Sequence, residues 1–123
     1  MSGDPHVTFL EMVQRLYGDF RRTLEPIRVT SLQAGVLLYL HRCVDARVNE
    51  AASHLQVSPP TMTEVIQDLV RKRWVIKRRS VADGRAFQLR LSRRGEEMTR
   101  AIQHQVGQME ARAETLQQVQ PTV

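Results

Sequence analysis

The sequence predicts a mainly α-helical fold that carries one small β-hairpin. Apolar residues recur at helical spacing over most of the 123 residues, and the period changes to two in a short stretch after Trp74. That stretch is also basic: residues 71–94 hold ten Lys or Arg side chains and one acid, Asp83, although the whole chain holds 18 basic and 13 acidic residues. Basic side chains can simply solvate a strand face. Their concentration in one segment also fits a polyanionic partner.

The length and composition fit a single domain of residues 1–123 with one modest core. The longest run without a charged side chain, residues 29–41, is far shorter than the roughly 20 residues of a membrane span. Asp4 and Pro5 stand where a signal peptide needs a basic region, so we expect a cytoplasmic protein without a membrane partner. Cys43 is the only cysteine and cannot form an internal disulfide; a redox role for it stays open.

A first helix is predicted over residues 5–25, and Pro26 must close it. Its apolar residues recur at spacings of three and four, so they form one stripe that faces either a core or a partner. The stripe consists of Phe9, Val13, Leu16, Tyr17, Phe20 and Leu24.

Three further helices are predicted within residues 29–71. Thr30 and Gln33 resemble a capping box that opens a buried helix, and small residues mark a short helix over residues 49–55. After a turn, Ser58 is a good N-cap and Pro59 occupies the first position of the next helix. The apolar face of this helix contains Met62, Val65, Ile66 and Leu69. Its polar face contains Thr61, Thr63, Glu64, Gln67, Asp68 and Arg71, which suits a reader of the DNA major groove.

Two strands and a long helix complete the chain. Residues 75–78 and 87–91 alternate in polarity, and the turn between them contains Gly84, which is able to take a positive φ. We expect Trp74 to anchor the hairpin to the preceding helix. Ser92 then caps a helix over residues 93–119, whose near-heptad stripe usually needs another helix against it. The stripe consists of Met98, Ile102, Val106, Met109, Ala113 and Leu116.

Helix, helix-turn-helix, hairpin and helix in this order make a winged helix-turn-helix with a flanking helix at each end. Residues 29–95 resemble the MarR (multiple antibiotic resistance regulator) family. The resemblance includes residues 30–33, 50–55 and 61–63. Its most specific part is Asp83-Gly84-Arg85 followed by Leu89-Arg90-Leu91-Ser92 and Gly95.

The resemblance implies a DNA-binding winged-helix core over residues 29–92 and a dimeric transcription regulator, a ligand-responsive repressor, on a pseudo-palindromic operator in double-stranded DNA. The fourth helix would enter the major groove, and Arg85, braced by Asp83, would enter the minor groove. The predicted DNA-binding residues are Ser58, Pro60, Thr61, Thr63, Glu64, Gln67, Arg71, Lys77, Arg78, Arg79, Asp83 and Arg85. The predicted homodimer residues are Phe9, Val13, Leu16, Tyr17, Phe20, Met98, Ile102, Val106, Met109 and Leu116. Family members often have a ligand cleft between the dimer interface and the DNA-reading helices. The resemblance therefore also implies a small-molecule effector as a candidate partner.

The sequence departs from the family at three places. Arg73 stands where relatives commonly have a glycine, so we expect a strained or an extended backbone there. The segment after Gly95 is short for the two C-terminal helices usual in the family, so we expect a reduced or rebuilt dimer interface. Glu64 and Asp68 on the reading face leave an alternative function open, a winged-helix module that docks a protein partner. No motif for an enzyme, a cofactor or a metal site is present in the sequence.

Overall fold

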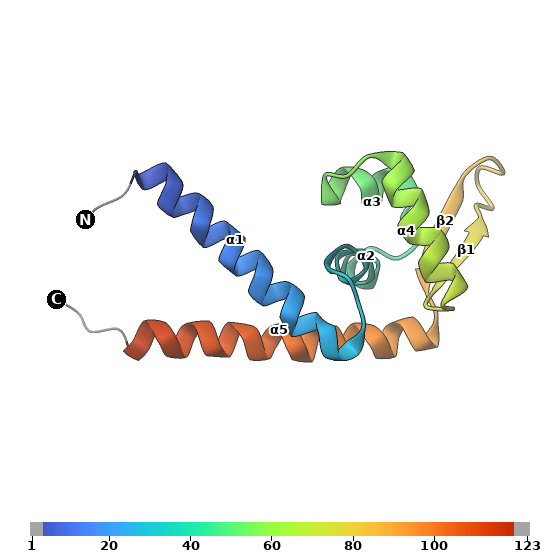
Figure 1. The fold of residues 1–123 in the computed structure, drawn as a ribbon. Helices are drawn as coiled ribbons and strands as arrows, with labels where there is room; N and C mark the ends of the chain where they lie inside the picture. Colours follow the sequence, from blue (N-terminus) through green and yellow to red (C-terminus); the bar gives the residue numbers. More distant parts are fainter. Residues whose placement is uncertain (1–3, 120–123) are drawn as a thin grey trace. The chain divides into compact units, whose positions relative to one another are not determined.

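The computed structural model describes residues 4–119, except for the side chains of Pro5 and of residues 113–119. It confirms a mainly α-helical fold with one β-hairpin (Figure 1). The elements are α1 (Pro5–Leu24), the 3-10 helix η1 (Glu25–Ile27), α2 (Ser31–Arg42), α3 (Val48–Leu55), α4 (Pro59–Arg71), β1 (Val75–Arg79), β2 (Phe87–Leu91) and α5 (Arg93–Val119). Two compact units result: the winged-helix unit, Leu32–Ala101, and the terminal unit, formed by the segments up to Ser31 and from Ile102.

The core of the winged-helix unit is formed largely by one face of α2 and one face of α4. Val36, Leu37 and Leu40 of α2 are buried, as the apolar run predicted. The buried residues of α4 are Met62, Ile66 and Leu69, whereas Val65 is half-buried. These positions are three or four residues apart, so burial fixes which side of α4 faces solvent.

The N-terminal end of α4 is capped as the sequence predicted. The Ser58 hydroxyl accepts a hydrogen bond from the backbone N–H of Thr61 at 3.3 Å, and Pro59 begins the helix. In front of it, α3 begins at Val48, one residue earlier than expected.

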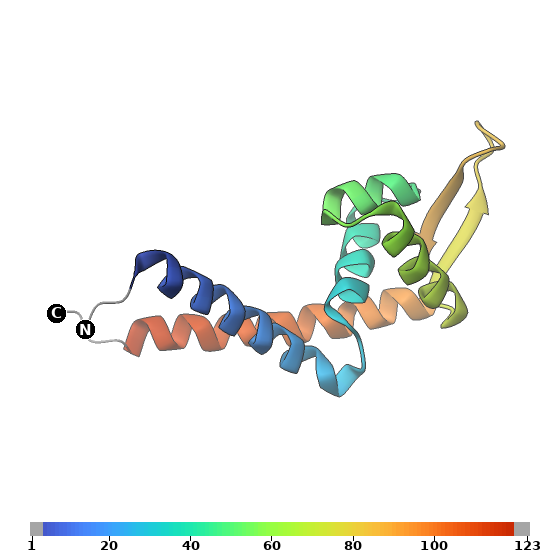
Figure 2. The same ribbon diagram turned by 45° about the horizontal axis from the view of Figure 1, so that its top comes forward.

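The hairpin pairs β1 with β2 in antiparallel register, Val75 opposite Leu91 and Arg79 opposite Phe87 (Figure 2). A short third edge was not predicted: Ala46 forms an isolated bridge with Leu89, whose N–H donates to the Ala46 carbonyl at 2.7 Å. Next to this bridge the Arg90 guanidinium binds the Asp45 carboxylate at 2.9 to 3.1 Å. The loop before α3 is therefore fastened to the base of the wing.

The sequence raised the question of a positive φ at Arg73 and at Gly84, and the structure shows one only at Arg73. Arg73 has a φ of 64°, which confirms the strained alternative at the exit from α4. Gly84 does not have the positive φ that the sequence allowed, and the other described glycines have none either. Ser80 supplies the turn instead, since its backbone pairs with Ala86 and its hydroxyl accepts from the Asp83 N–H at 3.2 Å.

The start of α5 is joined to the exit from α4. The Ser92 N–H donates to the Trp74 carbonyl at 3.0 Å, and the Ser92 hydroxyl donates to the Arg73 carbonyl. The same hydroxyl accepts from the Gly95 N–H at 3.0 Å, so Ser92 caps α5 as predicted. Trp74 is half-buried at this junction, and the Lys72 ammonium lies 4.9 Å from its ring.

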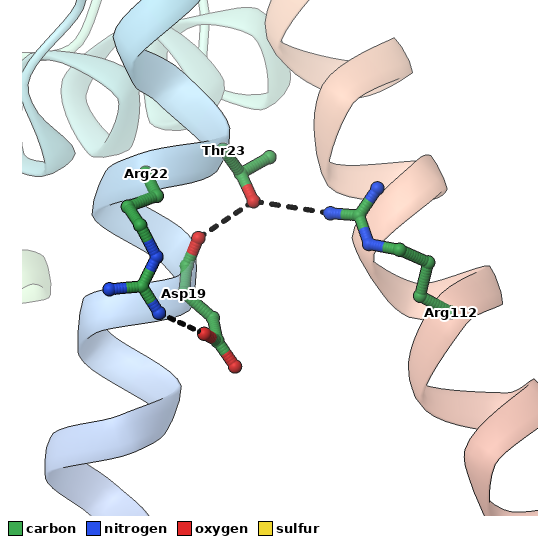
Figure 3. Close-up of polar contacts among 4 residues, drawn as sticks. All are labelled: Asp19, Arg22, Thr23 and Arg112. Carbon is green, nitrogen blue, oxygen red and sulfur yellow. Dashed lines mark hydrogen bonds and ion pairs between the residues drawn. The ribbon is translucent and has the colours of Figure 1, made fainter.

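The terminal unit pairs α1 with the C-terminal part of α5. The side-chain amide of Gln105 donates to the Thr23 carbonyl at 3.2 Å, and Arg112 donates to the Thr23 hydroxyl at 3.4 Å (Figure 3). Nearby on α1 the Arg22 guanidinium binds Asp19. Polar contacts therefore join the two helices near the C-terminal end of α1.

Candidate nucleic-acid interface

The solvent face of α4 carries Pro60, Glu64, Gln67 and Arg71, all exposed. Their spacings of four, three and four residues place them opposite the buried stripe of the same helix. Gln67 offers both a donor and an acceptor, and Arg71 offers only donors. This face can therefore form hydrogen bonds with base edges as well as with phosphates.

The three predicted hydroxyl residues lie at the N-terminal end of α4, where they take part in local hydrogen bonds. The Ser58 hydroxyl donates to the Thr61 hydroxyl at 2.9 Å, and both residues are exposed. Thr63 is half-buried, and its hydroxyl donates to the Pro59 carbonyl at 2.9 Å. The hydroxyl oxygens keep acceptor capacity, but their proton positions are set by the helix terminus.

Asp68 lies at the flank of the exposed face and is bound from the core side. The side-chain amide of Gln33 on α2 donates to the Asp68 carboxylate at 3.0 Å, and Arg71 lies 3.6 Å from the same group. Gln33 is only 6% exposed, so this contact joins α4 to the core, and the Asp68 side chain itself is 43% exposed. Glu64 is the acid that remains on the exposed face.

The three consecutive cations of β1 point to two sides of the hairpin. The register places Lys77 and Arg79 on the side of Phe87, and Arg78 on the side of Gln88. The Lys77 ammonium lies 4.6 Å from the Phe87 ring, and the Arg79 guanidinium lies 5.1 Å from it. Arg79 also donates to the Gly84 carbonyl at 2.6 Å, so it stiffens the wing turn.

Asp83 and Arg85 lie together in that turn. The Asp83 carboxylate accepts the backbone N–H of Arg85 at 3.1 Å, and both side chains are exposed. The bond acts on the Arg85 backbone and leaves the donors of the exposed guanidinium unused by Asp83. In Figure 2 the hairpin projects away from α3 and α4, with this turn at its free end.

The predicted dimer residues of α1 form an exposed apolar surface. Phe9, Leu16 and Tyr17 are 62%, 58% and 54% exposed. An apolar groove of about 470 Å³ runs from Val13 and Phe20 to residues of α5 within the same unit. Among the predicted α5 residues, Val106 and Met109 line this groove, Met98 is half-buried, and Ile102 is fully buried. The side chain of Leu116 lies outside the described residues.

Cys43 lies just after α2, half-buried beside Tyr39. Burial, with Cys43 next to it, raises the pKa of the Tyr39 hydroxyl, so the hydroxyl stays protonated at neutral pH. The Tyr39 ring also stacks on His54, with ring centroids 4.6 Å apart. Over the described part of the chain, no group of three or more His, Cys, Asp or Glu could hold a metal ion. Within the same limits, no helix has the length and apolar character of a membrane span.

Two residues of the wing base were missed by the sequence reasoning. Asp45 has a φ of 64° and binds Arg90, which the sequence had indicated only as part of the family motif. A pair so distant in sequence leaves no local pattern.

Three helices followed by a hairpin, with a polar helix face beside a basic turn, define a winged helix-turn-helix. A model of the MarR family matches residues 29–86 of this chain, which include α2, α3, α4 and β1. No curated protein matches the chain.

Solved structures of similar fold cover most of the chain. A mutant of MepR from Staphylococcus aureus has a TM-score of 0.84 at 21% identity, covering 93% of this chain and 85% of that one. A mutant of MarR from E. coli has a TM-score of 0.83 at 21% identity, covering 98% and 88%. CouR, a transcriptional repressor solved on a 23-mer DNA duplex, has a TM-score of 0.79 at 22% identity, covering 85% and 73%. At such identities the likeness establishes the fold.

Proposed function

We propose that this chain is a transcription regulator that reads a specific sequence in double-stranded DNA. The observation that carries the proposal is the exposed face of α4, where Gln67 and Arg71 stand in the same unit as a basic wing that ends in Arg85. Gln67 is suited to base edges in the major groove, and Arg85 to the negative potential of a narrow minor groove. The similar fold of CouR on DNA supports this proposal.

The active form in this proposal is a homodimer on a pseudo-palindromic operator. The apolar face of α1 is too large for a surface in contact with water, and a second copy of the same face would cover it. Two reading helices related by a two-fold axis would then meet two half-sites about one DNA turn apart.

The proposal includes control by a small molecule, with the regulator acting as a repressor. A hollow of about 410 Å³ in the terminal unit lies between the Tyr17 side of α1 and residues 28–31. These residues lead directly into α2, whose Gln33 holds Asp68 of the reading helix. A ligand in the hollow would therefore act on the segment that begins the core of the reading head.

Selection of bound fragments from a random DNA pool tests the proposal. We expect recovery of an inverted repeat, and we expect Gln67→Ala to change which bases are preferred more than it changes the salt dependence. Asn at the same position is a useful control, since it keeps the amide on a shorter side chain. A pool without any enriched sequence would support the alternative function, a winged-helix module that docks a protein. The acid on the exposed face of α4 that favours this alternative is Glu64.

A further inference from the structure

A cavity of about 340 Å³ lies between the start of α3 and the wing. Arg47 and Asn49 line it from the α3 side, and Lys77, Arg85 and Phe87 line it from the hairpin. All of these residues belong to the winged-helix unit, so the whole lining of the cavity comes from one compact unit. Arg47 and Asn49 lie outside the basic segment, residues 71–94, and were not among the predicted DNA-binding residues.

The cavity gathers three cations from separate segments of the chain. Arg47, Lys77 and Arg85 are exposed, and the single carboxylate in the lining, Asp83, already accepts the backbone N–H of Arg85. Among the side chains that the structure describes, no ion pair joins any of the three cations to an acid, whereas Arg90 and Arg71 each have one. Three like charges around one cavity repel each other unless an anion lies between them.

Other contacts position the Arg47 backbone and the Lys77 side chain. The Arg47 N–H donates to the Glu50 carboxylate at 2.8 Å, which holds the Arg47 backbone at the start of α3. The Lys77 ammonium lies over the Phe87 ring at 4.6 Å. The bridge between Ala46 and Leu89 connects the segment before α3 with β2, which lie on the two sides of the cavity.

We propose that this cavity binds one phosphate group of the DNA backbone, with Arg47 and Lys77 as its charged partners and the Asn49 amide as a hydrogen-bond donor. The proposal rests on the proposed DNA-binding function and adds a contact to it. The cations lie at an exposed rim next to Arg85, so the bound phosphate belongs to the strand that borders the minor groove entered by the wing. Such a contact sets the register of the wing without reading sequence.

Salt dependence of duplex binding tests the contact. We compare the parent with Arg47→Ala, Arg47→Lys and, as a matched control, Arg100→Ala, which removes an exposed arginine of α5 outside the cavity. Loss of one phosphate contact lowers the slope of log K against log salt concentration by about 0.9. We expect this loss for Arg47→Ala on operator and on random duplex alike, and a slope near that of the parent for Arg47→Lys and Arg100→Ala.

A slope unchanged by Arg47→Ala, in a variant whose melting curve matches the parent, overturns the proposal. Titration of the parent with inorganic phosphate, followed by the NMR amide signals of Asn49 and Phe87, separates the sources of the anion. Saturation at low concentration together with an unchanged slope would assign the cavity to a free phosphate and reject the backbone contact. If Arg47→Ala lowers the slope on random duplex while no sequence is enriched from the pool, the contact stands and the proposed specific regulator fails. A parent that binds no duplex rejects both.

Discussion

Gln33 of α2 donates a hydrogen bond to Asp68 of α4 at 3.0 Å, and this contact changes how the reading helix is understood. The sequence placed Asp68 on the polar face together with Glu64, where an acid would repel DNA. In the structure Asp68 lies on the flank of α4 and binds a buried amide. Its carboxylate therefore holds the helix on its core.

Asp68→Ala should lower the free energy of unfolding by about 1 kcal/mol, because the buried amide of Gln33 loses a hydrogen-bond acceptor. The ion pair with Arg71 adds little, since both side chains are largely exposed. Glu64→Ala, on the exposed face, is the control and should change stability by less than about 0.5 kcal/mol. Urea unfolding of the two variants measures the difference, and equal stabilities would show that the contact contributes nothing.

For DNA affinity we expect the opposite order, with a larger effect for Glu64→Ala than for Asp68→Ala. Glu64→Ala removes the acid from the exposed face and should tighten binding to duplexes of any sequence. Asp68→Ala removes a charge that Gln33 and Arg71 already bind, so its effect on affinity should be smaller. Fluorescence anisotropy with a labelled duplex at fixed salt distinguishes the two, and a larger gain for Asp68→Ala would place that carboxylate on the reading surface after all.

Gly95→Ala should destabilise the winged-helix unit because a Cβ at this position would lie 2.0 Å from the Trp74 carbonyl oxygen. The clash involves backbone that Ser92 holds in place, and overpacking of this kind costs about 1 to 3 kcal/mol. Gly107 of α5 has open space around its Cα, so Gly107→Ala should instead stabilise the protein by about 0.5 to 1 kcal/mol. Thermal melts of both variants test the pair, and a Tm for Gly95→Ala as high as that of the parent would reject the steric argument.

The elements with strong local signals were predictable from sequence. Ser58 and Pro59 marked the start of α4 because capping and a missing N–H act within one turn. Alternation located both strands, and Ser92 located the start of α5. The motif containing Ser92 and Gly95 had a physical cause that no single pattern disclosed, the close approach of α5 to the Trp74 carbonyl.

The parts that escaped prediction depend on contacts between distant residues. The bridge from Ala46 to Leu89 involves one residue pair and leaves no periodicity. A helical-wheel projection of α4 cannot decide whether a flank residue such as Asp68 faces solvent or contacts Gln33, because the angular position of Asp68 on the helix allows both. The cavity beside the wing could not be predicted either, because Arg47 and Lys77 line it together only when the hairpin is folded.

Arg73→Gly should stabilise the chain. A left-handed backbone costs a residue with a Cβ roughly 1 to 2 kcal/mol, and Arg73 has a φ of 64° with an exposed side chain. We expect a gain of about 1 kcal/mol in the free energy of unfolding, reduced by the greater chain entropy of glycine in the unfolded state. Arg73→Ala, which removes the same charge and keeps the Cβ, is the matched control and should show no gain. Equal stabilities for the two variants would mean that the backbone at Arg73 stores no strain.

Assembly can be tested at Leu16, which is 58% exposed on α1 and lines the apolar groove of the terminal unit. Leu16→Asp places a charge on the surface that a second copy would cover, and burial of an unpaired carboxylate costs several kcal/mol. Because Leu16 is exposed in the single chain, the monomer should keep its fold. Val44→Asp, at a similarly exposed valine outside the terminal unit, should leave assembly unchanged. Light scattering at micromolar concentration should give twice 14.2 kDa for the parent and Val44→Asp, and the monomer mass for Leu16→Asp, with weaker operator binding. A parent that is monomeric and still binds operator tightly would leave a reader of single half-sites.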